Sequence, residues 1–271
     1  MLNVAFQGEH GAYSESAALR YFKVKINPIA LKTFSDVLES TTNKSTDYSI
    51  IPIENSLEGG IGESYDLLYY TKLNVVGEIY YRIKHCLIGL NKIDKIDTVY
   101  SHPQALGQCK KFIQSHNLKS IPTYDTAGSV KLIKNLNKRN VGCIASETAA
   151  KIFGLPVIKH DIEDYTNNYT RFLILSKSYS HRTGNDKTSI IFSVIHSPGS
   201  LYKMIKGFSD RNINLTKIES RPKKHNVGEY NFYVDFEGHI HDQKIKQALD
   251  DMKTYSLFLK IIGSYQVTRL T

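Results

Sequence analysis

The stretch Asn167-Asn168-Tyr169-Thr170-Arg171-Phe172-Leu173-Ile174-Leu175 carries polar and aromatic side chains directly into an apolar run. Consecutive large aliphatic residues bounded by polar ones are typical of a buried β-strand. The sequence therefore predicts that Thr170, Arg171 and Phe172 stand at the mouth of such a strand. Side chains at strand ends in α/β proteins face the crevice in which ligands bind. We expect part of the functional site here.

Upstream of this stretch, short apolar runs alternate with segments of helical periodicity. Strands are predicted at 4–6, 48–52, 75–83, 98–100, 121–124 and 141–144. Helices are predicted at 14–21, from 34, at 61–70, 103–114 and 127–136, and from 146, with Ser14 as the first N-cap. Strands separated by helices of about 10–15 residues favour βαβ units and a largely parallel sheet.

The C-terminal part has a different pattern. Residues 178–187 are polar and lack apolar periodicity, so they are predicted to link a domain of residues 1–177 to one of residues 188–266. In the second domain the predicted order is strand 188–196, helix 201–210, strands 215–220 and 230–236, helix 242–255 and strand 260–265, with a hairpin turn at 224–228. This β-α-β-β-α-β order predicts a ferredoxin-like domain, a four-stranded antiparallel sheet backed by two helices.

Composition and charge restrict the classes of function. The chain has 271 residues, 41% of them hydrophobic, which is enough for two domains with sizeable cores. Its formal net charge is +9, from 35 Lys and Arg against 26 Asp and Glu. The basic residues are scattered, and neither an arginine-rich arm nor zinc-finger spacing occurs, so we expect no nucleic-acid partner. A solvated basic surface and small anionic substrates fit this charge better.

Cysteine spacing and apolar runs indicate the compartment. Cys86, Cys109 and Cys143 are far apart and form no Cys-x-x-Cys, so neither a disulfide framework nor a zinc site is predicted. Reduced, mostly buried thiols are expected. The N-terminus lacks a basic region and a long apolar core, and no apolar run approaches ~18 residues. We therefore expect a soluble cytoplasmic protein with no membrane partner.

Four polar clusters fall at predicted strand-to-helix turns, namely residues 7–14, 51–60, 100–109 and 124–129. The spacing Gly8-x-x-Gly11 is not that of a dinucleotide fingerprint. Helix N-termini that face one crevice attract a small polyanion through their dipoles and free N–H groups. The clusters together predict an anion site without requiring a basic side chain.

Capping accounts for some polar residues of these clusters. Ser56 and Ser101 suit N-caps, and Thr126 is a candidate cap that leaves Asp125 to be explained separately. Ser101 beside His102 also suggests a hydrolase, but no Gly-x-Ser-x-Gly is present and adjacency in sequence does not place a base against a nucleophile. We favour hydrogen bonding to the backbone or to substrate for Ser101.

Three phrases in this order resemble the prephenate dehydratase domain: Pro-Ile-Glu-Asn-Ser (52–56), Tyr-Ser-His-Pro-Gln-Ala-Leu (100–106) and Thr-Arg-Phe (170–172). The match covers essentially residues 1–176. The resemblance implies two α/β lobes around a cleft, similar to periplasmic binding proteins, with one lobe formed by about 1–78 plus 160–176 and the other by 79–159. It implies that prephenate loses its ring hydroxyl and ring carboxylate, which gives phenylpyruvate, carbon dioxide and water.

The resemblance also assigns roles. Thr170 matches the catalytic threonine and would donate a proton or hydrogen bond to the departing hydroxyl, through a relay because a threonine hydroxyl is a weak acid. The remaining catalytic candidates are Asn55, Gln108, Glu54 and Ser101. The candidates for binding substrate are Thr126, Asp125, Arg171, Ser56 and Ala127. Glu54 and Asp125 orient neighbours or supply the proton, and Arg171 pairs with a substrate carboxylate or with a buried acidic side chain. No cofactor and no metal are implied.

Residues 188–265 resemble an ACT domain, an amino-acid-sensing module. The match rests on His-Ser-Pro-Gly-Ser-Leu-Tyr (196–202) and Ile-Glu-Ser-Arg-Pro (218–222). It implies an L-phenylalanine site formed by Gly199, Ser200, Leu201, Glu219, Ser220 and Arg221. Ser200 stands where many members have alanine, so a hydroxyl is added near the pocket and is expected to change the affinity for L-phenylalanine. Such modules pair edge to edge, which covers exposed strand edges, so a homodimer or homotetramer is expected.

Two other functions remain open at this point. Arogenate, which carries an amino group where prephenate carries a ketone, is dehydrated by close relatives, and the motifs do not decide between the two substrates. A two-lobed amino-acid sensor without catalysis is the alternative of another class. The presence of Thr170, Asn55 and Gln108 argues against a sensor, because binding alone gives that set no evident use.

Overall fold

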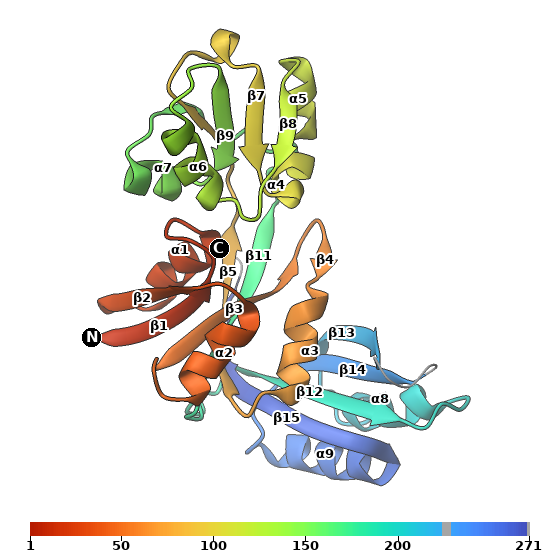
Figure 1. The fold of residues 1–271 in the computed structure, drawn as a ribbon. Coiled ribbons are helices and arrows are strands. Elements are labelled where there is room, and N and C mark those ends of the chain that lie inside the picture. The colour runs from red at the N-terminus through yellow and green to blue at the C-terminus, as the bar shows by residue number, and fades with distance from the viewer. Residues whose placement is uncertain (224–228, 270–271) are drawn as a thin grey trace.

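The computed structural model describes residues 1–223 and 229–269, and in this part the chain forms three β-sheets (Figure 1). The turn predicted at 224–228 lies outside the described residues. Two sheets form the lobes of the N-terminal part, one above the other in Figure 1, and the third belongs to the C-terminal domain beside the lower lobe. The predicted two-lobed α/β architecture followed by a C-terminal α/β domain is confirmed.

The first sheet forms the lower lobe, with strand order β2-β1-β3-β11-β5 and with β4 paired to β3. Its strands are β1 (Leu2–Gln7), β2 (Ile26–Leu31), β3 (Tyr48–Asn55), β4 (Gly59–Gly60), β5 (Asn74–Arg82) and β11 (Tyr169–Ser176). Its helices are α1 (Tyr13–Tyr21), α2 (Phe34–Thr42) and α3 (Gly62–Tyr70). Strand β1 is parallel to β2 and β3, whereas β11 is antiparallel to β3 and β5. The central strand β11 thus returns from the other lobe between two strands of the first.

The second sheet forms the upper lobe, with strand order β10-β6-β9-β7-β8. Its strands are β6 (Cys86–Gly89), β7 (Thr98–Ser101), β8 (Lys119–Pro122), β9 (Val141–Ala145) and β10 (Val157–Lys159). Its helices are the 3₁₀ turn η1 (Ile93–Lys95), α4 (Pro103–Gln108), α5 (Lys110–Ser115), α6 (Gly128–Leu136) and α7 (Glu147–Phe153). The chain enters this lobe after β5, which continues in the first sheet to Arg82, and leaves it after β10.

Several details of secondary structure differ from the prediction. The sheets are mixed rather than largely parallel, because β11, β6 and β10 pair antiparallel where the chain crosses between lobes. Strands β2, β4, β6 and β10 were not predicted, since they are short or interrupted by polar residues and proline. The helix predicted at 103–114 is two helices, separated at Cys109, whose φ of −116° and ψ of 24° are not helical. Cys86, Cys109 and Cys143 are free and buried, as predicted.

The C-terminal sheet has the strand order β13-β14-β12-β15, and every neighbouring pair is antiparallel. Its elements are β12 (Asp186–Val194), α8 (Ser200–Ser209), β13 (Leu215–Pro222), β14 (Tyr230–Glu237), α9 (Gln243–Tyr255) and β15 (Ser256–Gln266). Helices α8 and α9 cover one face through a core that includes Phe192, Met204, Phe208, Phe236 and Met252. The predicted ferredoxin-like arrangement is confirmed.

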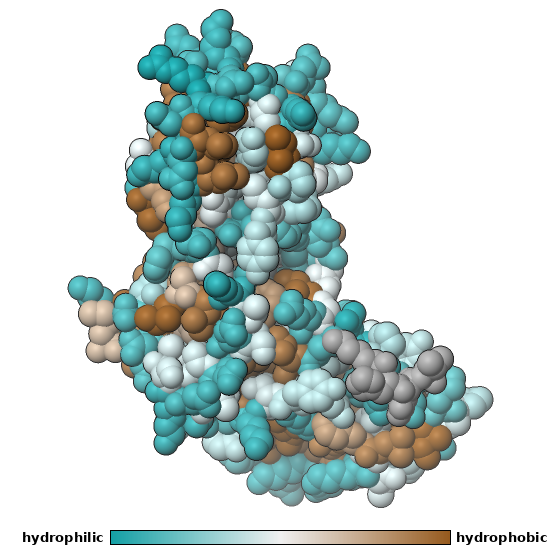
Figure 2. Space-filling view, in the orientation of Figure 1, coloured by the Kyte–Doolittle hydropathy of each residue, from teal (hydrophilic) through white to brown (hydrophobic). Residues whose placement is uncertain are grey.

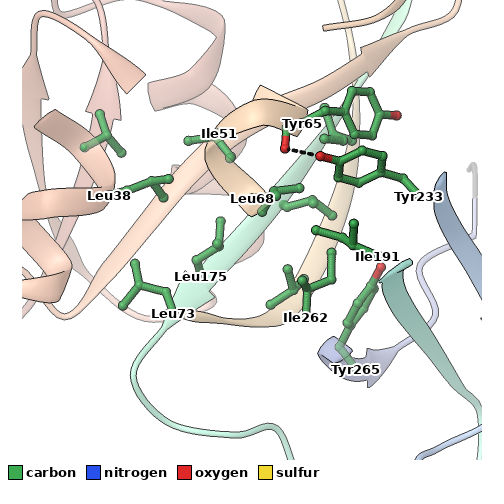
Figure 3. Close-up of a cluster of buried hydrophobic side chains, with 14 of the residues drawn as sticks. Leu38, Ile51, Tyr65, Leu68, Leu73, Leu175, Ile191, Tyr233, Ile262 and Tyr265 are labelled. Atoms are coloured by element: carbon green, nitrogen blue, oxygen red, sulfur yellow. Dashed lines mark hydrogen bonds between the residues drawn. The ribbon is translucent and has the colours of Figure 1, made fainter. Parts of the chain in front are cut away.

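The other face of the C-terminal sheet packs on the lower lobe (Figure 3). Ile191, Tyr233, Ile262 and Tyr265 of this sheet belong to one buried cluster with residues of the lower lobe, among them Leu68 and Leu175. The Tyr233 hydroxyl donates a hydrogen bond of 2.8 Å to the Tyr65 carbonyl. Strand alternation explains this arrangement, because even-numbered residues of β12 face the helices and odd-numbered ones face the lobe. The two domains therefore share a hydrophobic core.

Among the described residues, no helix has both the length and the apolar character needed to cross a bilayer. The face shown in Figure 2 carries mostly hydrophilic side chains, with hydrophobic ones in separate patches.

Lys260 fixes the C-terminal end of α3 against β15. Its ammonium group donates to the carbonyl oxygens of Leu68 at 3.0 Å, Tyr69 at 2.9 Å and Thr71 at 2.5 Å. We expect Lys260→Met to lower the free energy of unfolding by about 1–3 kcal/mol, because it leaves carbonyls at a partly buried helix end without their donor. Urea unfolding measures the effect, and the exposed Lys246→Met is the matched control. Equal stabilities of the two variants would contradict this role.

Candidate active site

A cavity of about 450 Å³ lies between the two lobes. Strand ends of the lower lobe and helix N-termini of both lobes form its walls. The polar and charged residues that line it include Tyr13, Ser14, Lys32, Thr33, Asn55, Glu63, His85, His102, Gln104, Gln108, Asp125, Thr126 and Thr170. The location at strand ends between two lobes is the one that the sequence predicted for the site.

Thr170 and Asn55 face this cavity from neighbouring strands. They are direct partners in the antiparallel pairing of β11 with β3, and Asn55 Nδ2 donates a hydrogen bond of 3.0 Å to Thr170 Oγ1. Asn55 Oδ1 accepts from the backbone N–H groups of Leu57 at 3.0 Å and Glu58 at 3.2 Å, which fixes the amide so that its nitrogen faces Thr170. Within the described residues, Thr170 Oγ1 has no other side-chain hydrogen-bond partner. Its own proton is therefore available to a ligand in the cavity.

The hydrogen-bond network continues from Asn55 into the upper lobe. Asn55 Nδ2 also donates to Asn168 Oδ1 at 2.8 Å, and Asn168 Nδ2 donates to Gln108 Oε1 at 2.8 Å. Gln108 Oε1 accepts a second hydrogen bond from His85 Nε2 at 2.9 Å. The side-chain amides of Asn55, Asn168 and Gln108 are all buried. The network therefore holds Thr170 in one orientation and joins the two lobes behind the cavity.

His85 and Tyr13 end this network as neutral groups. Burial lowers the pKa of His85, against the opposing effect of its hydrogen bond to Gln108, and burial raises the pKa of Tyr13 well above its ordinary value. A neutral His85 that donates through Nε2 accepts at Nδ1, which lies 2.9 Å from the Tyr13 hydroxyl. The single proton of that hydroxyl serves either this nitrogen or the Lys84 carbonyl, which lies 2.6 Å away. His85 and Tyr13 therefore add polar atoms but no charge to the lining of the cavity.

Groups of both signs line the cavity, with Lys32 and three helix N-termini against the carboxylates of Glu63 and Asp125. The N-terminal residues of α1, α2 and α6, three helices of nine residues each, line its wall. Their dipoles add positive potential to that of the Lys32 ammonium group. His102 contributes little charge, because burial lowers its pKa although Asp125 opposes this shift. A small ligand with carboxylate groups suits this field.

The structure brings six of the ten predicted site residues of the N-terminal part into the cavity. These six are Thr170, Asn55, Gln108, Asp125, Thr126 and Ala127. Four do not line it, namely Glu54, Arg171, Ser101 and Ser56. For Glu54 and Arg171 the reason is strand alternation, since each directly neighbours a residue whose side chain faces the cavity.

Arg171 lies in a buried ion-pair cluster on the far side of the sheet. Its Nε donates to Glu78 Oε2 at 2.8 Å, and one of its terminal nitrogens donates to Asp235 Oδ2 at 2.6 Å. The same nitrogen lies 3.4 Å from Glu54 Oε1, and only 2% of Arg171 is exposed. Of the two alternatives for Arg171, the structure shows the buried pair with acidic side chains and not a position in the substrate cavity.

Ser101 and Ser56 form hydrogen bonds to the backbone. Ser101 Oγ donates to the Ile144 carbonyl at 2.6 Å, and its residue is fully buried. Ser56 Oγ donates to the Asn167 carbonyl at 2.7 Å and accepts from the Tyr169 N–H at 2.9 Å. The predicted capping roles are wrong for both, and a hydrolase with Ser101 as nucleophile has no support in this geometry.

Capping at the other helices also differs from the prediction. Ala127 occupies the N-cap position of α6, and the capping hydrogen bond comes from Asp125, two residues earlier, whose Oδ1 accepts from the N–H of the first helical residue, Gly128, at 2.5 Å. The Thr126 side chain is thereby left at the cavity. Helix α4 is capped by His102, whose Nδ1 accepts from the Gln104 N–H at 3.3 Å. Helix α1 has Ala12 at its N-cap, so Ser14 lies inside the helix and lines the cavity.

Several cavity residues were not predicted as site residues, namely Tyr13, Ser14, Lys32, Thr33, Glu63, His85 and Gln104. Lys32 follows β2, a strand that the sequence pattern did not reveal. His85 lies in the segment that crosses between the lobes, where no periodicity marks a position. Ser14 belongs to the polar cluster at residues 7–14, but it was predicted as an N-cap and therefore not as a cavity residue.

The second predicted site lies in the C-terminal domain. Gly199 has a φ of +80°, which favours glycine, and Ser200 Oγ lies 2.7 Å from Ser197 Oγ in the same turn. Leu201 packs against the helix-covered core. The turn follows β12, and the β12–β14–β13 pairing sets Ser193, Asn231 and Arg221 in one row. The end of β13 and the Gly199 turn therefore lie at the same end of the sheet, two strands apart.

Glu219, Ser220 and Arg221 alternate in direction along β13. An Arg221 terminal nitrogen lies 3.7 Å from Asp66 Oδ1 in α3, and Glu219 faces the lower lobe near Gly60. Ser220 is exposed. Only Ser220 of the three is therefore turned away from the lower lobe.

Comparison with known proteins gives a consistent result. The family model described as prephenate dehydratase matches residues 4–180, and the ACT domain model matches residues 188–253. A protein named prephenate dehydratase from Methanocaldococcus jannaschii is 37% identical over 95% of this chain and 95% of its own. Arogenate dehydratase 2 from Petunia hybrida is 40% identical over 97% of this chain and 71% of its own. The crystal structure of prephenate dehydratase in complex with L-Phe from Arthrobacter aurescens has a TM-score of 0.90 at 28% identity, covering 98% of this chain and 90% of that one.

Proposed function

Because the chain belongs to the prephenate dehydratase family and carries an ACT domain, we propose that it converts prephenate to phenylpyruvate, carbon dioxide and water. The reaction would serve L-phenylalanine biosynthesis in the cytoplasm, under control by L-phenylalanine at the ACT domain. The single observation that supports the chemistry best is the Thr170 hydroxyl, whose oxygen accepts from Asn55 and whose proton is free to be donated into the cavity.

The proposed reaction needs one main contribution from the protein. Loss of the ring carboxylate as carbon dioxide leaves an electron pair that completes the aromatic ring as the ring carbon–oxygen bond breaks. The leaving group is hydroxide, which is poor unless it receives a proton or a strong hydrogen bond. Thr170 is the proposed donor, and the hydrogen bond from Asn55 Nδ2 holds its oxygen in place. Gln108 and Asn168 keep Asn55 in position through the buried amide network.

The charge of the cavity suits the proposed substrate. Prephenate carries two carboxylates, and the N-termini of α1, α2 and α6 together with Lys32 provide positive potential without a buried cation. Thr126 and Ser14 are proposed to donate hydrogen bonds to these carboxylates. Asp125 acts as the cap that orients α6 rather than as a ligand.

Arogenate is the second candidate substrate. The Petunia hybrida relative is named for it, and its identity to this chain is slightly higher than that of the archaeal prephenate dehydratase. Glu63 lines the cavity and would complement the amino group of arogenate. A sensor without catalysis is disfavoured, because the buried amide network orients one hydroxyl and leaves its proton free.

The test is turnover by the purified protein. Prephenate and arogenate are supplied separately, and phenylpyruvate and L-phenylalanine are quantified with and without added L-phenylalanine. Phenylpyruvate formation from prephenate that L-phenylalanine suppresses supports the proposal. Turnover of arogenate alone would keep the chemistry and change the substrate. Absence of turnover with both would refute the proposed function.

The regulatory site is proposed to involve a second copy of the chain. The Gly199 turn and the C-terminal end of β13 lie at the same end of the ACT sheet. Strand β13 is an edge strand, and its residue Ile218 is 49% exposed. Pairing of two β13 edges would cover this strand and bring the phenylalanine-binding motifs of two chains together. Light scattering with and without L-phenylalanine tests for the homodimer or homotetramer.

We expect Lys32→Met to raise the KM for prephenate about two- to five-fold and to leave kcat within about two-fold, because an exposed ammonium contributes modest, uniform attraction to a dianion. Steady-state kinetics at low ionic strength measure the effect. Lys138→Met removes the same charge from an exposed position outside the cavity and is the control. An unchanged KM in Lys32→Met would place the substrate elsewhere.

A further inference from the structure

The strand pair that carries Thr170 and Asn55 has two functional faces. In the β11–β3 register Thr170 is opposite Asn55, and Arg171 is opposite Glu54. The first pair lines the cavity, and the second lies on the reverse side of the sheet, where Arg171 and Glu54 form an ion pair at 3.4 Å. Each cavity residue is thus joined by one rigid peptide unit to a charged residue on the reverse side.

Residues of the ACT domain hold that reverse pair. Asp235 of β14 accepts from Arg171 at 2.6 Å, and the Tyr265 hydroxyl of β15 accepts from Arg171 at 3.0 Å. Lys217 of β13 donates to Glu54 Oε2. Both charged residues of the reverse pair therefore have an ACT partner of opposite charge.

Both domains contribute charges to this cluster, which also includes Glu219, 3.9 Å from Lys217. The catalytic lobe supplies Arg171 against the two carboxylates of Glu54 and Glu78. The ACT domain supplies Lys187 and Lys217 against the carboxylate of Asp235, with Lys187 Nζ at 2.8 Å from Glu78 Oε1. Glu78 is fully buried and Arg171 is 2% exposed. Buried charges of this kind hold their geometry only while their partners stay in place.

The backbone ladder is interrupted at this position. The register of β11 against β3 shifts between Arg171 and Phe172, because Arg171 is opposite Glu54 while Phe172 is opposite Pro52. A bulge leaves one residue unpaired and bends the strand locally, and it redirects side chains near active sites. The unpaired residue, Ile53, lies on β3, so the direction of Asn55 depends on side-chain contacts more than it would in a regular ladder, whereas β11 keeps a continuous register with β5 from Tyr169 to Ile174.

We propose that Asp235 and Lys217 are positioning residues for the reaction: Asp235 acts on Thr170 through Arg171, and Lys217 acts on Asn55 through Glu54. The packing of the ACT sheet against the reverse side of β3 and β11 then determines kcat. A ligand bound beside β13 changes activity by moving these two contacts. This inference rests on the proposed dehydratase function.

The test compares full-length variants after turnover of the wild type has been established. Asp235→Asn is expected to lower kcat at least ten-fold, on the order of what a small misplacement of a catalytic group costs. Lys217→Gln is expected to lower kcat by about three- to ten-fold, and the KM of both variants stays within about two-fold of wild type. Lys253→Gln, which removes an exposed ACT ion pair with Asp250, is the matched control and keeps kcat within about two-fold.

A double-mutant cycle separates positioning from general loss of structure. If Lys217 acts through Glu54, the kcat of the double variant Glu54→Gln/Lys217→Gln lies within about two-fold of the lower single variant. Independent effects multiply instead and would overturn the proposal. A folded Asp235→Asn with wild-type kcat, verified by near-ultraviolet circular dichroism, would overturn it too. If Asp235→Asn does not fold, the cycle of Glu54→Gln and Lys217→Gln alone decides whether the proposal stands. A wild type inactive on prephenate and arogenate refutes the proposed function instead.

Discussion

Thr170→Val is expected to lower kcat for prephenate by about 10²–10⁴-fold with little change in KM. The substitution keeps the shape of the side chain and removes the hydroxyl whose proton faces the cavity. General-acid contributions are typically of this size, and a group that acts mainly in the transition state affects kcat rather than KM. Single-turnover kinetics and equilibrium binding of prephenate measure the two effects separately.

The control for this prediction is Thr170→Ser, which keeps the donor and loses only a methyl group. It is expected to retain activity within about ten-fold of wild type, because serine can accept the same hydrogen bond from Asn55 Nδ2. Asn55 also donates to Asn168, so its amide stays anchored in both variants. Wild-type turnover by Thr170→Val would reject Thr170 as the donor, and loss of binding together with turnover would point to damage of the whole cavity.

The central part of this site was predictable from the sequence. Thr170 precedes an apolar run, Asn55 ends another, and Gln108 lies on a helix that begins at Pro103. Strand ends and helix starts meet at one edge of an α/β sheet, so polar residues at those points converge even though they are far apart in the chain. The family resemblance then named the reaction, which spacing alone does not specify.

The residues that the prediction misplaced follow from a simpler rule. Successive side chains on a strand point to opposite faces, so the choice of Thr170 and Asn55 for the cavity already excludes Arg171 and Glu54. Their partners, Asp235 and Lys217, lie about 65 and 160 residues away in the chain, and no local pattern indicates such contacts. Lys32 and His85 were missed for a related reason, because irregular segments after a short strand and at a lobe crossing carry no periodicity.

Polar residues near helix starts were the other source of error. Sequence preference ranks serine as an N-cap, and Ser14, Ser56 and Ser101 were all assigned that way. In the structure, Ser101 bonds to a carbonyl of the neighbouring strand β9, Ser56 bonds to the Asn167 carbonyl just before β11, and Ser14 lines the cavity. The positions of those carbonyls depend on sheet order, which local sequence does not determine. Asp125, left over by the capping assignment, is the residue that caps α6.

Arg171→Met is expected to lower the free energy of unfolding by about 3–5 kcal/mol at neutral pH, the usual cost of removing one partner of a buried ion pair. Glu78 and Asp235 lose their guanidinium donor while they remain buried. The exposed pair of Arg182 with Asp242 supplies the control, since Arg182→Met is expected to change stability by about 1 kcal/mol or less. Urea unfolding of both variants measures the difference.

The pH dependence of that loss distinguishes an ion pair from lost packing. Burial alone would raise the pKa of Asp235, but Arg171 and the Ser189 hydrogen bond hold it below its ordinary value. In the wild type this contribution is present above the unfolded-state pKa and is lost as the pH falls through the folded-state pKa. Without Arg171 the burial effect dominates, so the pKa of Asp235 rises. In acid, protonation then removes the cost of burying an unpaired carboxylate. The stability difference between wild type and Arg171→Met should therefore shrink from pH 7 to pH 5. A difference that stays constant would attribute the loss to the packing of the arginine stem.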